Sequence, residues 1–287
     1  MKSLFVLCLA PLLLLAEPSA ALPKKLLVTS GEVQIELSAR HFWNLNGIWY
    51  RGRMVCQKNK GFYGTVLSYK GLGWVGTGHL ENKIGETEVV VEFLADGKPV
   101  APGQDAVTAS SFRLKKTSLL HQTRLHYELL LENNCLREQV TMEAVNDAEL
   151  GVLYHFMHPW ESCFQEFILQ GSHDPALKQV FSAENERKFV WEKSPSWAAL
   201  YDPTEKLGVL SVVHSDRLLG PEPQWLMWNR GRDRKLYYVP GKNIKHAPGT
   251  KSEARMLTCF FNSEAAEWSS QAAGLAAGKI PKLTANP

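Results

Sequence analysis

The 287-residue sequence predicts an all-β fold, a large antiparallel β-sandwich with one short helix near the C-terminus. Three observations lead to this prediction. Apolar and polar residues alternate in many segments, short turn motifs separate these segments, and helical periodicity is scarce. The chain shows no internal repeat and no low-complexity linker, so we expect a single β-sandwich domain over residues 22–287.

The first 21 residues are typical of a signal peptide. Lys2 gives a positive start, Leu4–Ala16 is almost wholly apolar, and Ser19–Ala21 supplies small residues that a signal peptidase reads. The apolar run is short for a membrane span, and an N-terminal membrane anchor is the alternative. We therefore expect a secreted or periplasmic protein that begins near Leu22 and has no membrane association after cleavage.

Composition narrows the class of protein. Hydrophobic residues make up 45% of the chain and charged residues 21%, which is ordinary for a globular protein with a core. The net charge of +3 is small and dispersed, which argues against a nucleic-acid partner. We expect no cofactor.

Cysteine usage leaves two interpretations open. Cys8 would leave with the signal peptide, so Cys56, Cys135, Cys163 and Cys259 remain. In an exported protein, this even number allows two disulfides in any of three pairings. The wide spacings and the size of the chain are equally compatible with buried free thiols. The chain has no CxxC motif, so a structural zinc site has little support.

Strand-like segments run along most of the chain. The clearest are the alternating residues Val33, Ile35 and Leu37, the run Leu125–Leu131 with Val140 and Met142 after an "ENN" turn, and the apolar runs Leu207–Val213 and Met256–Phe261. Turn motifs occur at 95–99, 144–147, 201–208 and 239–243. Only Glu264–Leu275 has a helical pattern.

A glycine-rich segment precedes one of the strands. In "GLGWVGTGHLENKIGETEVVVEF", Gly71–Phe93, the second half is strand-like, whereas the first nine residues contain four glycines. Glycines let the backbone approach a ligand closely, Trp74 offers a flat apolar face, and His79 offers a proton-transfer group. The alternative is a glycine-rich hairpin with Trp74 in the core and His79 as a satisfied polar residue.

A second candidate segment is "LYHFMHPWESCFQEF", Leu153–Phe167. If its beginning is an extended strand, His155 shares one face with Met157 and Tyr154 takes the other face with Phe156. This alternation predicts that His155 and Tyr154 point in opposite directions.

The same segment contains Pro159, which we expect to end regular strand pairing. His158 and Trp160 would then lie at a strand exit on the rim of a sheet, where functional loops collect. The HxxH spacing of His155 and His158 with Glu161 could form a metal trio, but the proline argues against a helix that presents both histidines. We therefore expect no metal.

The third segment, "GPEPQWLMWNRGRDRKLYY", combines aromatic and charged residues within Gly220–Tyr238. The relevant residues are Glu222, Trp225, Trp228, Arg230, Arg232 and Arg234. Sugars present flat C–H faces bounded by hydroxyls, so aromatic rings beside carboxylates and guanidiniums suit them. The alternative is a large aromatic core, which must account for several of the nine tryptophans.

Together these features resemble the galactose mutarotase-like supersandwich superfamily, which includes aldose epimerases, polysaccharide lyase families and sugar-binding domains. The resemblance implies that His79 and His155 correspond to the two epimerase histidines and Glu222, in "EPQ", to the epimerase base, with Pro248 and Gly249 as a late turn. His155 follows a tyrosine rather than the asparagine of the epimerase motif, and its interval to Glu222 is shorter. The resemblance covers most of the mature chain through short motifs.

We interpret the sequence as an exported carbohydrate-active enzyme of the lyase or epimerase type that transfers protons with histidine. The catalytic candidates are His79, His155, His158 and Glu222. The substrate-binding candidates are Trp74, Tyr154, Trp160, Trp225, Arg230 and Arg232. In a lyase, Arg51, Arg230 or Arg232 would stabilise the enolate that forms beside a uronate carboxylate.

Two alternatives come from other classes of protein. One is a noncatalytic protein that binds a mono-, oligo- or polysaccharide, and the other is an exported structural or interaction domain. A catalytic site predicts that His79 and His155 share one cleft with a tryptophan, whereas binding alone needs only aromatic residues in a groove. An interaction domain predicts an exposed apolar patch instead.

Overall fold

The computed structural model describes residues 22–57, 63–78, 80–173, 175–193, 195–217 and 223–278. The expected signal peptide, His79 and Glu222 lie outside the described residues. Within the described ranges, no helix has both the length and the apolar character needed to cross a membrane.

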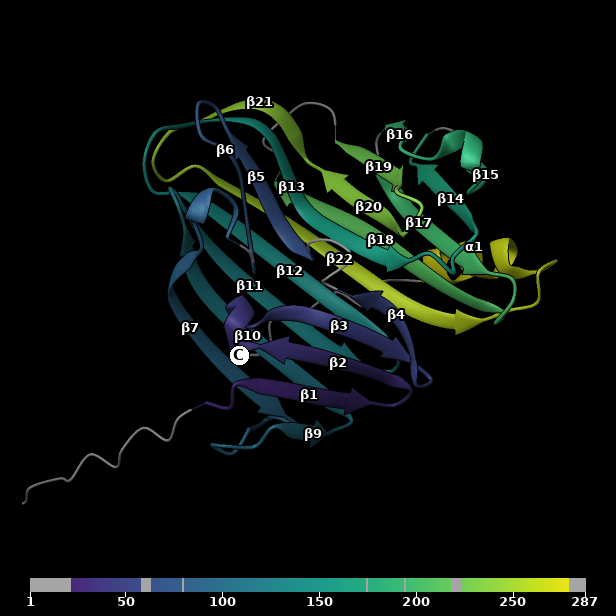
Figure 1. The fold of residues 1–287 in the computed structure, drawn as a ribbon, viewed down its shortest axis with the longest axis horizontal. Helices are drawn as coiled ribbons and strands as arrows, with labels where there is room; N and C mark the ends of the chain where they lie inside the picture. Colours follow the sequence, from purple (N-terminus) through teal and green to yellow (C-terminus); the bar gives the residue numbers. More distant parts are fainter. Residues whose placement is uncertain are drawn as a thin grey trace, which may run out of the picture.

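Two stacked β-sheets form the fold, as Figure 1 shows. Within the described residues, one sheet has 12 strands and the other has 10. Their ladders are antiparallel, apart from the parallel pairing of the N-terminal strand of the 12-stranded sheet with its edge strand. The predicted all-β antiparallel sandwich is therefore confirmed.

The 12-stranded sheet combines the N-terminal strands with strands from the second half of the chain. In chain order it contains β1 (Lys25–Ser30), β2 (Val33–Ser38), β3 (Asn44–Tyr50), β4 (Arg53–Gln57), β5 (Gly64–Tyr69), β6 (Gly73–Gly76), β9 (Ala106–Thr108), β13 (Ala148–Glu161), β16 (Phe189–Lys193), β19 (Gln224–Asn229), β20 (Asp233–Val239) and β21 (Gly241–His246). The long strand β13 is its centre, because β4, β5, β20 and β21 all pair with it.

The ten-stranded sheet is a second layer over the first. In chain order it contains β7 (Glu86–Ala95), β8 (Lys98–Pro99), β10 (Ser111–Leu120), β11 (Thr123–Glu132), β12 (Cys135–Ala144), β14 (Glu166–Gly171), β15 (Leu177–Val180), β17 (Pro195–Asp202), β18 (Leu207–Arg217) and β22 (Lys251–Asn262). Strand β22 lies between β12 and β18 and joins the two halves of this sheet.

The main core lies between the two sheets and follows the alternation of the sequence. Val33, Ile35 and Leu37 of β2 are completely buried in it, as their spacing predicts. In β10, the core-facing positions also include two polar residues, Lys116 and Ser118. The sandwich therefore has polar side chains inside it as well as apolar ones.

The turn motifs are only partly confirmed. The "ENN" motif is a two-residue hairpin between β11 and β12, with Asn133 and Asn134 at φ 51° and 59°, which suits asparagine. The motif at 239–243 is not a chain reversal, because only Pro240 separates β20 from β21 and both strands pair with β13. A proline can interrupt a ladder without turning the chain.

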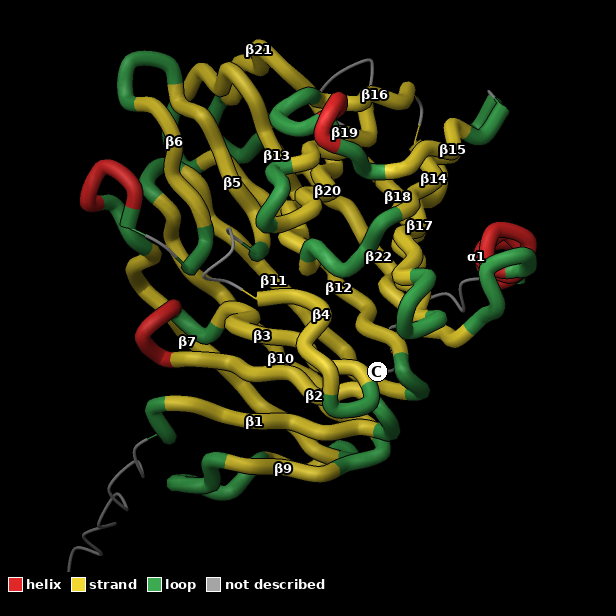
Figure 2. The backbone as a smooth tube through the Cα atoms, turned by 45° about the vertical axis from the view of Figure 1, so that its right-hand side comes forward, coloured by secondary structure: helices red, strands yellow, loops and turns green. Residues whose placement is uncertain are grey.

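The short C-terminal helix is confirmed, with bounds slightly later than expected. It is α1 (Trp268–Ala277), and it packs against β17 and β18 on the outer face of the ten-stranded sheet (Figure 2). Trp268 is completely buried there and stacks on Tyr201, with ring centroids 5.1 Å apart. The described residues also include three short 3₁₀ segments, which are η1 (Ala39–His41), η3 (Glu81–Lys83) and η4 (Ala183–Asn185).

The cysteines divide between the two interpretations. Cys135 and Cys259 are directly opposite each other on β12 and β22 and form a disulfide. Cys56 is a buried free thiol, and Cys163 is a partly buried one. This disulfide crosslinks two neighbouring strands near the middle of the ten-stranded sheet.

Candidate functional site

A groove of about 310 Å³ lies on the face of the 12-stranded sheet that is turned away from the other sheet. We call it the aromatic groove. Its lining comes from six strands that are neighbours in the order β6, β5, β13, β20, β19 and β16. The lining residues are Val66, Trp74, Tyr154, Met157, Phe189, Trp228, Lys235 and Tyr237.

Strand alternation explains why β20 contributes to this groove. Lys235 and Tyr237 line it, whereas Leu236 and Tyr238 lie between them in sequence and belong to the main core. Successive side chains of a strand point to opposite faces of the sheet. The run "KLYY" therefore supplies one lysine and one tyrosine to the groove and one leucine and one tyrosine to the core.

A β-bulge in β13 brings Tyr154 and Met157 to the same face. Tyr154 is opposite Val66 and Met157 is opposite Gly64, so three steps along β13 match two steps along β5. Both residues line the groove, while Phe156 belongs to the main core. The expected regular alternation, with Tyr154 beside Phe156, is therefore wrong.

Aromatic rings form the two ends of the groove. At one end Trp74 stacks on Tyr154, with ring centroids 5.5 Å apart and planes 9° apart, and Tyr237 follows 4.6 Å from Tyr154. At the other end Phe189 stacks on Trp228 at 4.9 Å. Trp74 is 38% exposed and Phe189 is 46% exposed, so each end offers ring surface to a ligand.

Two phenol hydroxyls line the groove between these ends. Among the residues that the structure describes, the hydroxyls of Tyr154 and Tyr237 have no hydrogen-bond partner. Burial raises the pKa of both groups, so both stay protonated at neutral pH and can donate as well as accept. Lys235 also lines the groove and is nearly buried.

Charged residues flank the Trp228 end. The Arg230 guanidinium lies over the Trp228 ring, 5.0 Å from its centroid, in a cation–π arrangement. Arg230 and Arg232 both approach Asp233, at 3.7 and 3.5 Å. Burial raises the pKa of Asp233, and the nearby Arg230 charge opposes that shift. Of the predicted binding residues, Arg230 therefore flanks the groove, whereas the exposed Arg232 does not line it and pairs with the buried Asp233.

The glycine-rich segment holds Trp74 in a defined position. Asn82, in η3, donates from its amide nitrogen to the backbone carbonyls of Trp74 and Leu72, at 3.0 and 3.1 Å. Gly71 and Gly73 have φ of 83° and 95°, a backbone conformation that favours glycine. The glycines therefore shape a fixed strand end, and Trp74 lies at the surface instead of in the core.

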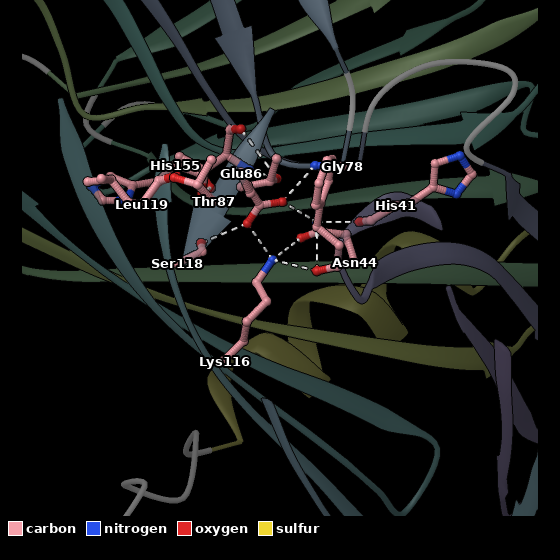
Figure 3. Close-up of polar contacts among 12 residues, drawn as sticks. His41, Asn44, Gly78, Glu86, Thr87, Lys116, Ser118, Leu119 and His155 are labelled. Carbon is pink, nitrogen blue, oxygen red and sulfur yellow. Dashed lines mark hydrogen bonds and ion pairs between the residues drawn. The ribbon is translucent and has the colours of Figure 1, made fainter. Parts of the chain in front are cut away.

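A buried ion pair supports the far end of this segment (Figure 3). Lys116 and Glu86 are 2.7 Å apart, and their side chains are at most 1% exposed. The carboxylate also accepts hydrogen bonds from Asn44 at 2.6 Å, Ser118 at 2.8 Å and the Gly78 backbone N–H at 2.9 Å. Every oxygen of this buried carboxylate therefore has partners, as a buried charge requires.

A second buried carboxylate, Glu138, lies at a core-facing position of β12. Tyr63 and Tyr127 each donate a hydrogen bond of 2.9 Å to it, one to each oxygen. His158 Nε2 lies 3.3 Å from the same carboxylate, and the His158 ring stacks on Tyr63 at 4.3 Å. Lys116 Nζ lies 5.8 Å from the Tyr127 ring and links both groups of residues. We call the two groups together the buried polar layer.

His155 also faces the interior of the sandwich. It is completely buried, and its Nε2 lies 2.6 Å from the Ser252 hydroxyl of β22. Burial, reinforced by neighbouring His246, lowers the pKa of His155 to about 3, so the ring is neutral at physiological pH. The structure places His155 on the core side of β13 and Trp74 on the opposite side, so the two do not share one cleft.

His158 and Trp160 do not lie at a strand exit. Strand β13 continues past Pro159 to Glu161, and its pairing with β20 continues too. On its other edge, β13 changes partner from β5 to β4 between Met157 and Trp160, so the missing N–H of Pro159 falls between two neighbours. The expected end of pairing at Pro159 is therefore wrong.

Two of the predicted binding tryptophans are core residues. Trp160 and Trp225 are completely buried in the main core, so neither ring can stack on a ligand. Arg51 pairs with Glu32 at 2.9 Å, in the loop after β3. Phe189, Trp228, Lys235 and Tyr237 line the groove but were not among the predicted site residues. The alternation around Trp225 and within "KLYY" is the signal that separates groove residues from core residues.

Across the described ranges, no group of three or more histidine, cysteine, aspartate or glutamate side chains is arranged to hold a metal ion. In particular, His155 and His158 have separate partners, Ser252 and Glu138. The HxxH motif thus supplies two buried polar side chains.

Comparison with known proteins identifies the fold. No family model and no curated protein matches the sequence. Similar solved structures include the galactosidase domain of an α-galactosidase–sucrose kinase (TM-score 0.54, 6% identity, 86% of this chain and 42% of that chain). A GH36 α-galactosidase from Geobacillus stearothermophilus gives a TM-score of 0.53 at 8% identity, over 84% and 40% of the two chains. A putative aldose 1-epimerase from Escherichia coli K12 gives 0.45 at 12% identity, over 83% and 99%.

The chain spans about two fifths of the length of these two galactosidase structures. At such low identity the likeness shows the fold alone. At that level the likeness agrees with the predicted supersandwich fold.

Proposed function

We propose that this protein binds carbohydrate in the aromatic groove. The observation that carries the proposal is the combination of exposed rings at Trp74 and Phe189 with the hydroxyls of Tyr154 and Tyr237, which have no hydrogen-bond partner in the part of the chain that the structure describes. The C–H face of a sugar stacks on aromatic rings, and its hydroxyls need donors and acceptors at the same surface. Similar folds in proteins named as α-galactosidases agree with a sugar ligand.

The polar groups in the groove favour a sugar over a protein partner. A hydrophobic interaction patch would leave the Tyr237 hydroxyl buried against apolar side chains, at a cost of a few kcal/mol for an unsatisfied polar group. A sugar hydroxyl can instead pair with the Tyr237 hydroxyl. The interaction-domain alternative therefore fits the groove less well.

A glycan array followed by isothermal titration calorimetry tests the proposal. We expect Trp74→Ala and Trp228→Ala each to raise Kd at least about tenfold, because each removes part of an aromatic end of the groove. Trp49→Ala is the matched control, because Trp49 is a partly exposed tryptophan that packs over Gly47 on β3, outside the groove. Wild-type binding in both groove variants would contradict the proposal, as would an array with no bound glycan.

We further propose that the protein acts on the bound sugar as an enzyme, and this proposal depends on His79 and Glu222. His155 and His158 are buried, so we propose that His79, directly after Gly78, is the proton-transfer residue. The support is positional: the Gly78 N–H donates a hydrogen bond to Glu86, and Trp74 lies five residues before His79 on the same segment. Glu222 is the complementary acid or base, because it precedes β19, which carries Trp228.

Two assays test this finer proposal. One follows unsaturated products from polyuronides by absorbance, and the other follows the rate of anomer interconversion in simple aldoses. We expect His79→Ala to lower turnover by about 10²–10⁴ while sugar affinity changes little. Sugar binding without turnover in the wild-type protein would identify a noncatalytic carbohydrate-binding protein.

We also propose that residues 1–21 direct export and are removed. The support is the signal-like sequence together with the Cys135–Cys259 disulfide, which persists in oxidising compartments. N-terminal sequencing of the native protein should find a start near Leu22. Recovery of Met1 on a membrane-bound protein would instead support the anchor.

A further inference from the structure

The aromatic groove extends across six strands, which sets the length of ligand it can hold. Five spacings of about 4.8 Å separate adjacent strands, so β6 and β16 lie about 24 Å apart across the sheet. Trp74 is on the first of these strands and Phe189 is on the last. The side chains lean over their neighbours and shorten this span, but one pyranose ring still cannot contact both ends.

The residues between the two ends form a continuous path. Met157 is directly opposite Tyr237, and Trp228 is directly opposite both Lys235 and Phe189. These two rows of paired positions lie two residues apart along β20, so together they form an oblique path across β13, β20, β19 and β16. The path is open at the sheet surface, whereas sites for single small molecules usually enclose 70–90% of the ligand surface.

The chemistry of the path changes along its length. Aromatic ring surface is exposed at the Trp74 and Phe189 ends, where sugar faces can stack. The middle carries the Tyr154 and Tyr237 hydroxyls and Lys235, which suit the hydroxyls on the edges of a sugar chain. A chain of linked sugars can use both kinds of contact at once, whereas a single sugar uses only one end.

From this arrangement we infer that the ligand is a linear oligosaccharide, or a segment of a polysaccharide, that lies across the strands from Trp74 to Phe189. The inference rests on the proposed carbohydrate-binding function. Given the strand spacing, the groove accommodates roughly three or more linked sugars. The groove thus has two stacking subsites, one at each aromatic end, joined by a polar middle section.

Titration calorimetry with oligosaccharides of increasing length tests the inference. The probes are cello-, malto- and galacto-oligosaccharides and oligogalacturonides of one to six residues, each titrated into the full-length purified protein. We expect Kd to fall by about tenfold between the monosaccharide, which occupies one stacking subsite, and the tetrasaccharide, which occupies both, and then to change little.

Variants at the two ends make the test specific to the groove. Trp74→Ala and Phe189→Ala should each raise Kd for the hexasaccharide about tenfold, and the double variant about 100-fold, because distant subsites act additively. In each single variant, Kd should also stop falling at a shorter oligosaccharide length than in the wild-type protein. Trp49→Ala should leave the whole length dependence unchanged.

Three outcomes separate a failure of the oligosaccharide inference from a failure of the proposed carbohydrate-binding function. A monosaccharide that binds as tightly as its hexasaccharide would overturn the inference and leave carbohydrate binding intact. A length dependence that Phe189→Ala does not alter would also overturn it, because the ligand would then not reach that end. The absence of binding by every series and by the glycan array would reject the proposed function itself.

Discussion

The aromatic groove and the buried polar layer contain similar side chains, but they use them differently. In the buried layer, the hydroxyls of Tyr63 and Tyr127 donate hydrogen bonds to Glu138, so their protons are used in bonds within the protein. In the groove, the hydroxyls of Tyr154 and Tyr237 have no partner among the described residues. The difference between the two regions thus lies in the hydrogen-bond partners of the tyrosines and not in the residue type.

The two regions also differ in what their charges do. Lys116 and Glu86 neutralise each other at the interior, although burial lowers the pKa of Lys116 against the effect of Glu86. At the groove, Arg230 lies over an aromatic ring near solvent. We therefore expect substitutions in the buried layer to affect stability and substitutions in the groove to affect affinity.

The largest expected effect comes from breaking the buried ion pair. Glu86→Ala leaves the Lys116 charge buried without its counter-ion, so the free energy of unfolding should fall by about 3–5 kcal/mol. Urea denaturation followed by circular dichroism measures this loss. The control is Lys115→Ala. Lys115 lies next to Lys116 on the outer face of β10 and forms a 3.9 Å ion pair with Glu92, so its loss should change stability by at most about 0.5 kcal/mol. A small loss in Glu86→Ala would show that the ion pair contributes little.

The second prediction concerns acid. Below pH 6.5 the unfolded chain binds a proton at His155, whereas folded His155 has a pKa of about 3 and does not. Stability should therefore fall as pH decreases from 6.5 toward 3, with His155 contributing up to about 1.4 kcal/mol per pH unit. His155→Gln should flatten the pH dependence measured by urea denaturation, and His126→Gln, at an exposed histidine, should not. Identical slopes for wild type and His155→Gln would refute the assignment.

The third prediction tests the buried polar layer by removing a single hydroxyl group. Tyr63→Phe removes the hydroxyl that donates to Glu138, so the free energy of unfolding should fall by about 1–3 kcal/mol. Sugar affinity should not change, because Tyr63 does not line the groove. Denaturation and calorimetry on the same preparation provide both measurements.

The smallest effect is expected at the matching position of the groove. Tyr237→Phe removes a hydroxyl that has no partner among the described residues, so stability should change by at most about 0.5 kcal/mol, while Kd for a bound oligosaccharide should rise about three- to tenfold. If Tyr237→Phe instead destabilises the protein as much as Tyr63→Phe does, its hydroxyl serves the fold, and the distinction between the regions fails.

The fold was predictable from sequence because strand alternation reports which face of a sheet is buried. Val33, Ile35 and Leu37 are an example, since all three are in the core. The buried polar layer was not predictable in the same way. Lys116 and Glu138 occupy core-facing positions, and the partners that make this possible come from distant strands. Sequence shows the alternation but not these contacts between sheets.

Only part of the candidate site was predictable. Trp74, Tyr154 and Arg230 were expected to bind the ligand, and the structure places them at the groove. Trp160 and Trp225 were expected there too, but tryptophan suits a core and a sugar site equally well. The sequence also did not reveal which residues of β13 face the groove. The bulge after Tyr154 changes that alternation, and it is set by pairing with β5 and not by a local sequence signal.

The position of β22 has a consequence for how the protein forms during synthesis. This strand is among the last parts of the described chain to emerge from the ribosome, yet it fills the place between β12 and β18. Until it arrives, the ten-stranded sheet exists as two halves, each with an open edge that can pair with another chain. A nascent chain that stalls before residue 251 should therefore be prone to aggregation, and the Cys135–Cys259 bond can form only after that last strand has entered the gap.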